Sequence, residues 1–222
     1  MDVVLNISRF NPEADREPYF QEFTVTVEGH QTVLDAMLIA WRQDPGLSFR
    51  RSCRSAICGS CAVCINGVPG LACQALIRNA AGDSGRITLG PLPRFRQVKD
   101  LVVDLEPFFE SLKAVVPWVV TREDYSGNMD PEASRKLESL VTCILCGVCD
   151  AAMDVPGKVK PAALVKGLRM VLDPRDSLGA ARLRLMEVPP EILRLFIRDL
   201  PDKCPKGIKG TGLLAPQGSI RP

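Results

Sequence analysis

Eight of the nine cysteines in this 222-residue chain fall into two groups, and their spacing restricts the possible folds. In the first group, Cys53, Cys58 and Cys61 are followed by Cys73. The spacing C-x4-C-x2-C…C is typical of a plant-type [2Fe–2S] site, in which four thiolates bind the irons. A chain with this motif must form a loop that brings three neighbouring sulfurs close to a distant fourth.

The second group has three cysteines at steps of three residues, Cys143, Cys146 and Cys149, and a distant Cys204 followed by Pro205. Three local ligands and one remote ligand before a proline favour a [4Fe–4S] cluster. Two redox centres in one chain predict a protein that conducts electrons.

Zinc is the alternative occupant, because four thiolates also bind this metal. Zinc ligands usually come as closely spaced pairs, so the five-residue step from Cys53 to Cys58 argues against zinc in the first group. The second group is less specific. A structural or assembly module with zinc in these sites therefore remains an alternative. Cys64 belongs to neither group and is expected to be a small, buried apolar residue on a strand.

Composition narrows the classes of function. The net charge of +2 gives no electrostatic case for nucleic acid, and 46% hydrophobic with 24% charged residues is ordinary for a soluble globular protein. The sequence shows neither an apolar stretch of membrane-spanning length nor the features of a signal peptide. His30 is the single histidine, so no histidine-based catalytic set can be built. We expect a cytoplasmic protein with reduced thiols and no catalytic residue of its own.

The first half of the sequence predicts a small α+β domain over residues 1–106. Apolar residues alternate with polar ones at 3–8 and 23–28, which predicts two strands. A helix is expected to begin at Thr32 as the N-cap, with apolar residues recurring at helical spacing. Further strands are predicted at 62–65, 71–77 and 87–89, with the first two joined by a turn at Asn66-Gly67.

Helical patterns dominate from 107 to 222. A short helix is expected after Pro107, and Asp130-Pro131 is a good helix start because the capping residue precedes a proline. Pro161 and Pro189-Pro190 open two more helices, and the last residues are expected to form an extended tail. The predicted fold class is α+β: a plant-type ferredoxin-like (β-grasp) domain followed by an all-α ferredoxin-like domain over 107–222.

Several motifs in order make the chain resemble one family, the iron–sulfur subunits of succinate dehydrogenase and fumarate reductase. They are Cys53-Arg54-Ser55, Asn66-Gly67, Leu71-Ala72-Cys73, the run from Val98 to Asp104, Cys143 to Gly147, Pro161 to Leu164, Asp173 with Arg175-Asp176, and Cys204 to Gly207. The resemblance implies a partner subunit that carries FAD and interconverts a dicarboxylate with its unsaturated form. Electrons would pass between FAD, the [2Fe–2S] cluster and the [4Fe–4S] cluster.

The departures from the family pattern are informative. Family members carry a third centre, [3Fe–4S], beside a quinone site, and its three cysteines correspond here to Met153, Arg194 and Leu200. The histidine expected after the second of these ligands is Leu195, and the aromatic stretch after the first is shortened to Asp154–Gly157. Because the other eight ligands are retained, we expect the third centre and its quinone site to be absent.

Two further expectations follow from the resemblance. The partner flavoprotein could act on a different acid or enone, since the iron–sulfur subunit does not touch the substrate. A further electron-transfer or anchor subunit could also bind. The protein would then be soluble, or peripheral to the cytoplasmic face of the membrane through its partners.

Overall fold

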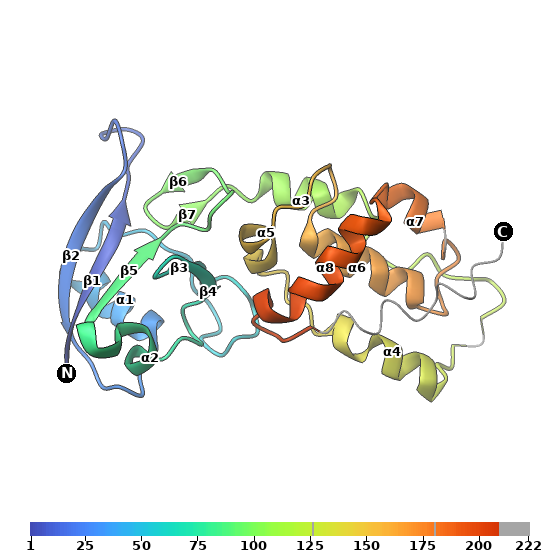
Figure 1. Ribbon diagram of the computed structural model, residues 1–222, viewed down its shortest axis with the longest axis horizontal. Coiled ribbons are helices and arrows are strands. Elements are labelled where there is room, and N and C mark those ends of the chain that lie inside the picture. Colours follow the sequence, from blue (N-terminus) through green and yellow to red (C-terminus); the bar gives the residue numbers. More distant parts are fainter. Residues whose placement is uncertain (126, 180, 209–222) are drawn as a thin grey trace. The chain divides into compact units, whose positions relative to one another are not determined.

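The computed structural model describes residues 1–125, 127–179 and 181–208, apart from the side chain of Leu195. The predicted C-terminal tail lies outside the described residues from position 209 onward. Contacts divide the chain into two units, and the helices and strands of each can be followed in Figure 1. Unit 1 comprises Met1–Leu105 and Ile144–Ala152, and unit 2 comprises Glu106–Cys143 and Met153 onward.

Unit 1 is built on a five-stranded mixed sheet in the order β2-β1-β5-β3-β4. Its strands are β1 (Asp2–Arg9), β2 (Tyr19–Thr26), β3 (Ala62–Ile65), β4 (Val68–Leu71) and β5 (Arg86–Gly90). Strand β5 runs parallel to β1, and the other neighbours are antiparallel. A sheet of this mixed type, packed against one helix, agrees with the α+β class predicted for the first half of the chain.

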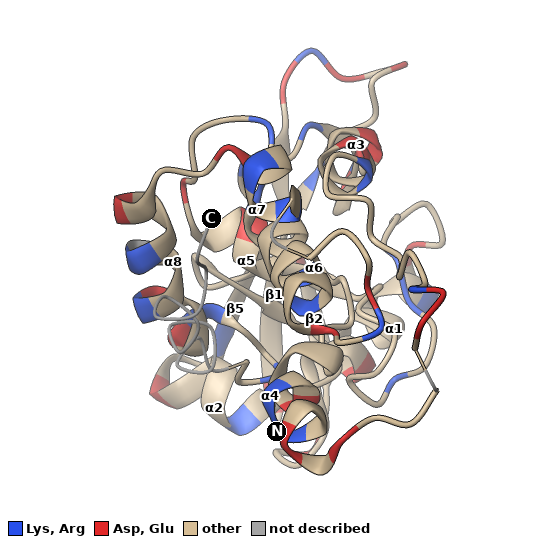
Figure 2. Ribbon diagram, turned by 90° about the vertical axis from the view of Figure 1, so that its right-hand side faces the viewer, with Lys and Arg blue, Asp and Glu red and all other residues tan. Residues whose placement is uncertain are grey.

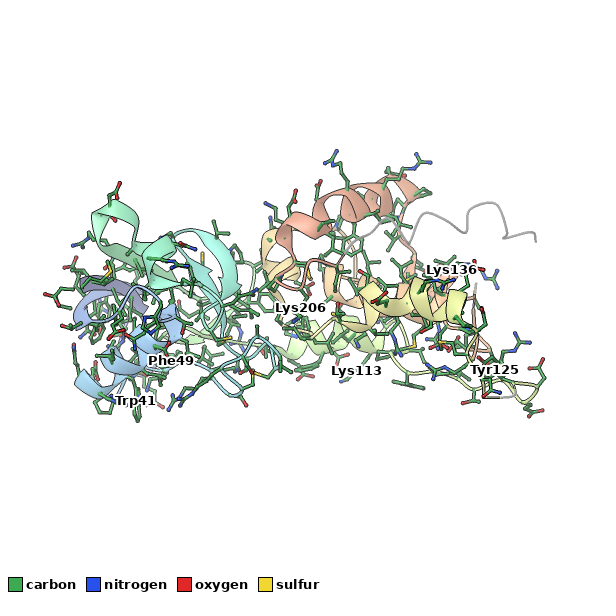
Figure 3. All side chains as sticks on the ribbon, turned by 90° about the horizontal axis from the view of Figure 1, so that it is seen from below. Trp41, Phe49, Lys113, Tyr125, Lys136 and Lys206 are labelled. Atoms are coloured by element: carbon green, nitrogen blue, oxygen red, sulfur yellow. The ribbon has the colours of Figure 1, made fainter. Side chains whose placement is uncertain are left out.

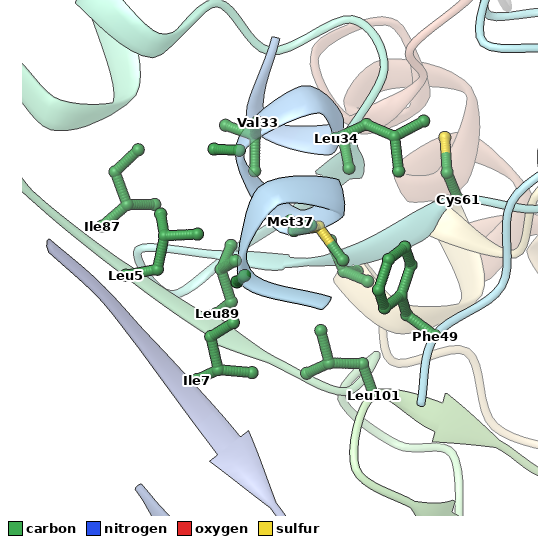
Figure 4. Packing of buried hydrophobic residues seen from close by; sticks show 14 of the residues in the cluster. Leu5, Ile7, Val33, Leu34, Met37, Phe49, Cys61, Ile87, Leu89 and Leu101 are labelled. Carbon is green, nitrogen blue, oxygen red and sulfur yellow. The ribbon is translucent and has the colours of Figure 1, made fainter. Parts of the chain in front are cut away.

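Helix α1 (Val33–Gln43) covers one face of the sheet and begins where the sequence predicts. Thr32 is the N-cap: its hydroxyl accepts a hydrogen bond from the Asp35 N–H, and the Asp35 carboxylate accepts one from the Thr32 N–H at 2.9 Å. Apolar side chains of the helix pack on buried residues of β1 and β5 (Figure 4). This core includes Leu5, Ile7, Val33, Leu34, Met37, Ile87 and Leu89.

The hairpin prediction is half right. Asn66 and Gly67 both have positive φ, as the turn between β3 and β4 requires. The strand predicted at 71–77 is wrong, because β4 ends at Leu71. The N–H groups of Gln74 and Ala75 donate to the Leu71 carbonyl, so the chain turns there. It then enters α2 (Ile77–Ala81) and a short 3₁₀ helix, η1 (Gly82–Ser84), neither of which the sequence pattern indicated.

A buried arginine clamps distant parts of unit 1 together. Arg9 lies at the end of β1, and its guanidinium donates to the carboxylates of Asp100 at 3.0 Å and Asp44 at 2.7 Å. Asp100 also accepts hydrogen bonds from the N–H groups of Phe10 and Ser48. Burial lowers the pKa of Arg9, but the two carboxylates outweigh that effect and raise it. Near this clamp lies a short unpredicted ribbon, β6 (Gln97–Lys99) with β7 (Val102–Val103).

Unit 2 is helical in its described part, as predicted from residue 107 onward. Its helices are α3 (Glu106–Lys113), α4 (Pro131–Val141), α6 (Pro161–Leu172), α7 (Ala181–Met186) and α8 (Pro190–Lys203). Asp130 caps α4 by accepting from the N–H groups of Glu132 and Ala133, which confirms the predicted start. Helix α6 is the most buried, whereas α4 and α8 carry charges of both signs (Figure 2).

A second buried arginine organises unit 2. Arg182 on α7 has no exposed surface, and its Nε donates to Asp176 at 2.9 Å. Its other donors reach three backbone carbonyls, those of Val115, Val116 and Trp118. Burial raises the pKa of Asp176, but hydrogen bonds from Arg182 and from backbone N–H groups outweigh burial and lower it to about 2.

The domain boundary expected at 106/107 stays a prediction. In the contacts, unit 1 ends at Leu105 and takes up one later segment. Residues 144–152, which include the short helix α5 (Val148–Ala152), pack with unit 1. The reason is hydrophobic: Val148 is buried in the core of unit 1, and Ile144 packs against that core. No helix in the described ranges is both long and apolar enough to cross a bilayer.

Candidate iron–sulfur sites

The backbone of the first cysteine loop is bent by residues with left-handed conformations. Arg54, Ala56 and Gly59 have φ of +59°, +54° and +74°. Left-handed residues placed among ordinary ones turn successive N–H groups toward one side, which creates a concave surface suited to anionic groups and to iron–sulfur sites. Only Gly59 adopts this conformation without steric cost, so the loop holds strain at Arg54 and Ala56.

Backbone N–H groups in this loop point at the cysteine sulfurs. The Sγ atom of Cys53 accepts hydrogen bonds from the N–H groups of Ser55, Ile57 and Cys58, at 3.4, 3.4 and 3.2 Å. Cys58 Sγ accepts from the Cys53 N–H, and Cys73 Sγ accepts from the Ala56 N–H at 3.2 Å. Such donors stabilise thiolates and lower the electron density on ligated sulfur.

The four thiols have different electrostatic surroundings. Hydrogen bonds from the N–H groups of Ser55, Cys58 and Ile57 lower the pKa of Cys53 to about 6. Burial raises the pKa of Cys61 to about 12. Cys73 is buried as well, whereas Cys58 is exposed. A buried thiolate needs positive charge beside it, and coordination to iron would supply that charge.

These features fit a binuclear cluster. The donor set is four sulfurs, two of them buried in the core of unit 1 and two near the surface. Within the described residues, no three His, Cys, Asp or Glu side chains gather closely enough to hold one metal ion. A [2Fe–2S] cluster divides its four thiolates between two irons, so it does not require three ligands on one metal.

The second cysteine loop has a similar backbone. Leu145 and Gly147 have φ of +54° and +74°, so left-handed residues again alternate with the cysteines. Cys146 is half-buried, and Cys149 is buried at the start of α5 in unit 1. In unit 2, Cys143 follows α4 and Cys204 is the C-cap of α8. Cysteine sulfur is the donor type that a [4Fe–4S] cluster takes.

Gly59 brings the two cysteine loops into contact within unit 1. A Cβ atom at Gly59 would lie 2.8 Å from Cys146 Cβ and 2.9 Å from Cys146 Cα, where ordinary contact begins at 3.4 Å. It would also lie 3.1 Å from the carbonyl oxygen of Ile144. Glycine at this position is therefore needed both for its positive φ and for the absence of a side chain.

The positions that correspond to the third centre are occupied by unrelated side chains. Met153 is half-buried, Arg194 on α8 is exposed, and Leu200 on the same helix has no exposed surface. None offers a thiolate. Leu195, where the family has a histidine, carries a side chain that lies outside the described residues.

Some residues near the first loop were not found by sequence reasoning. The guanidinium of Arg51 lies over the rings of Trp41 and Phe49, at 5.0 and 5.3 Å from their centres, and the two rings are labelled together in Figure 3. The sequence offered only the closeness of Arg51 to Cys53 as a signal. His30 is exposed beside Glu28, and Cys64 is half-buried on β3, where burial raises its pKa.

Comparison with known proteins identifies the family. Residues 4–110 match a family model described as a 2Fe-2S iron-sulfur cluster binding domain. The chain is 34% identical over 217 residues to the succinate dehydrogenase iron-sulfur subunit of Coxiella burnetii, which covers 93% of this chain and 91% of that protein. The chain belongs to the family of succinate dehydrogenase and fumarate reductase iron–sulfur subunits.

Other members support this assignment. The fumarate reductase iron-sulfur subunit of Haemophilus influenzae is also 34% identical, with 92% of this chain and 88% of that protein covered. Among solved structures, a chain of the Mycobacterium smegmatis Sdh1 complex in the apo form superposes with a TM-score of 0.81 at 24% identity. It covers 95% of this chain and 90% of that chain, and the likeness confirms the fold of the family member.

Proposed function

We propose that this family member is an electron-transfer subunit with two clusters, which relays electrons between a partner FAD subunit and a further acceptor or donor. The [2Fe–2S] cluster is assigned to Cys53, Cys58, Cys61 and Cys73, and the [4Fe–4S] cluster to Cys143, Cys146, Cys149 and Cys204. The observation that carries the proposal is the first cysteine loop. Its backbone N–H groups donate hydrogen bonds to the sulfurs of Cys53 and Cys73, which are proposed ligands.

Substrate chemistry is assigned to the flavoprotein partner. The single histidine is exposed and pairs with Glu28, so this chain has no histidine placed for proton transfer. The family members are named as parts of succinate dehydrogenase and fumarate reductase, which makes a dicarboxylate the first substrate to test on the partner. The complex would lie in the cytoplasm or at the cytoplasmic face of the membrane, held there by its partners.

The iron–sulfur clusters would supply one-electron transfer, and the chain's own residues set their surroundings. Cys61 and Cys73 lie in the hydrophobic core, which keeps water from one side of the first site. The N–H donors to Cys53 and Cys73 stabilise added negative charge, so they favour reduction. Contact between Gly59 and Cys146 links the two ligand loops within unit 1.

The loss of the third centre is part of the proposal. Leu200 is completely buried, so a hydrocarbon side chain fills the position where the family has a ligand. Arg194 places a positive charge at another of these positions, which would repel an additional iron. Electrons would therefore leave from the [4Fe–4S] cluster, and the acceptor would be another protein rather than quinone at the family site.

Anaerobic purification of the chain with its flavoprotein partner tests the proposal. Iron and acid-labile sulfide should match one [2Fe–2S] and one [4Fe–4S] cluster, and EPR of the reduced protein should show both. A [3Fe–4S] signal in the oxidised protein would contradict the loss of the third centre. Zinc without sulfide would contradict the relay and support the structural module.

A variant pair tests the ligand assignment. Cys58→Ser should remove the [2Fe–2S] signal, because an exposed thiolate ligand is replaced by a weaker oxygen ligand. Cys64→Ser is the matched control, since Cys64 lies on β3 outside both cysteine groups, and it should leave both signals intact. Loss of the [2Fe–2S] signal in the control but not in Cys58→Ser would reject the assignment.

A further inference from the structure

Unit 2 contains a cavity of about 520 Å³ that the electron relay does not use. It is formed by α4, by α6 and by the segment that follows α6. Its lining combines three arginines with apolar side chains: Met129, Ser134, Arg135, Leu137, Glu138, Val141, Arg169 and Arg175. This volume lies within the usual range for small-molecule sites, which extends from about 300 to 1,000 Å³.

Arg169, which lines this cavity, has an incompletely hydrogen-bonded guanidinium. Its Nε is buried without a hydrogen-bond partner, and among the described residues no other buried side-chain nitrogen or oxygen is left unpartnered. The carboxylate oxygen nearest to the Arg169 guanidinium is Oδ2 of Asp173, which lies 3.9 Å from Nη2. Arg169 is only partly buried as a whole, whereas the buried arginines Arg9 and Arg182 both have a carboxylate oxygen within 3.0 Å. A poorly satisfied guanidinium is costly unless water or a ligand completes it.

Asp173 pairs more closely with Arg175 than with Arg169. The Nε and Nη2 atoms of Arg175 donate to both Asp173 oxygens, at 2.8 and 2.7 Å. Two guanidiniums therefore share one carboxylate. Of the remaining charged residues in the lining, Arg135 and Glu138 offset each other. The cavity with Asp173 thus carries a net charge of about one positive unit, which one monoanion would neutralise.

The apolar part of the lining indicates what kind of body such a monoanion would carry. Met129, Leu137 and Val141 offer hydrocarbon surface, and Ser134 adds a hydroxyl that can donate a hydrogen bond. Guanidinium groups present paired donors that match a carboxylate. We infer that this cavity binds a small monocarboxylate with a hydrocarbon body, with its carboxylate on Arg169 and Arg135 and its hydrocarbon against the apolar wall.

A small molecule fits better than an acidic side chain of a partner protein. One aspartate or glutamate side chain would neutralise the charge but would leave most of the 520 Å³ unfilled. A small carboxylate with a chain or ring can use both the charge and the apolar wall. The inference is independent of the clusters, since no cysteine is among the lining residues.

Isothermal titration of the 222-residue chain with hexanoate and benzoate tests the inference, with hexanamide as the uncharged probe. We expect saturable binding of at least one carboxylate, none of the amide, and a thermal stabilisation that follows occupancy. Arg135→Gln and Arg169→Gln should weaken binding by about tenfold or more, because each removes a charge-assisted hydrogen bond. Arg135 is exposed, so that variant should remain folded.

Lys136→Gln is the matched control. Lys136 is next to Arg135 on α4 and is labelled in Figure 3, but it pairs with Glu132 and does not line the cavity. Carboxylate binding should be unchanged in this variant. The inference is overturned if neither carboxylate saturates, if the amide binds equally, or if Lys136→Gln weakens binding as much as Arg135→Gln. Binding of an acidic peptide or of inorganic phosphate alone would also overturn it.

Discussion

Arg9 and Arg182 are both buried arginines, but their guanidinium groups bind different kinds of partner. Arg9 joins side chains around a sheet whose strands already hydrogen-bond to one another, and two carboxylates share its charge. Arg182 has one carboxylate and three backbone carbonyls, and it holds residues 115–118 to α7. A helical unit without a sheet can therefore use one side chain for cross-links that a sheet makes with its backbone.

The strongest test of this comparison is Arg182→Met. The substitution leaves Asp176 buried without its partner and removes the donors to three carbonyls. The free energy of unfolding should therefore fall by about 3–5 kcal/mol. Urea unfolding of the cluster-loaded protein, followed by circular dichroism, measures the loss. Arg184→Met on the exposed side of the same helix should cost little. Equal losses for the two variants would show that Arg182 has no special role.

A smaller loss is expected from Asp100→Asn in unit 1. The amide cannot accept on both sides as the carboxylate does from Arg9, Phe10 and Ser48, so stability should fall by about 2–3 kcal/mol. The loss should be below that of Arg182→Met because Asp44 still pairs with Arg9. Asp83→Asn, at an exposed position, is the control for the same urea measurement. A larger loss at Asp100 than at Arg182 would reverse the comparison.

Acid should act on unit 2 through Asp176. Its pKa in the folded protein is about 2, below the value of an unfolded aspartate, so its contribution is complete above about pH 5. That contribution, about 2 kcal/mol, should be lost as the pH falls toward 2. Urea midpoints measured across this range should decline less steeply in Asp176→Asn than in the wild type. Identical slopes would mean that Asp176 is not the group that titrates.

The smallest difference in stability is expected between alanine variants at two glycines of unit 1. Gly59→Ala and Gly67→Ala both force alanine into positive φ, but only the first places a methyl group against Cys146. Gly59→Ala should therefore be less stable than Gly67→Ala by about 1 kcal/mol or more. The cluster content of both variants, from iron and sulfide analysis, shows whether the loops still form. If Gly67→Ala is the less stable, the contact between the loops is not tight.

The sequence predicted local structure well where a single residue controls it. Thr32 and Asp130 cap helices because their side-chain oxygens accept from the next turn, an interaction within a few residues. The strand predicted at 71–77 failed because the turn after Leu71 depends on backbone bonds that no side-chain pattern shows. The two buried arginines were missed for a related reason, since arginine in sequence reads as a surface residue.

The candidate site could likewise be predicted from the sequence only in part. Cysteine spacing indicated which thiols to consider, and the assignment of ligands to clusters stays a prediction. The left-handed backbone at Arg54, Ala56 and Leu145 could not be predicted, because non-glycine residues adopt it only when their surroundings impose it. The cavity beside Arg169 was also invisible, since its lining residues come from separate segments.

Residue types alone established the chemistry that is available: two sets of thiols, no thiol at Met153, Arg194 or Leu200, and a single histidine. Those properties belong to residue types and survive any fold. Long-range packing, in contrast, is what places residues 144–152 in unit 1, Gly59 against Cys146, and Arg169 at 3.9 Å from the Asp173 carboxylate. These depend on packing between residues far apart in the chain, where burial and distance rather than residue type set the energy.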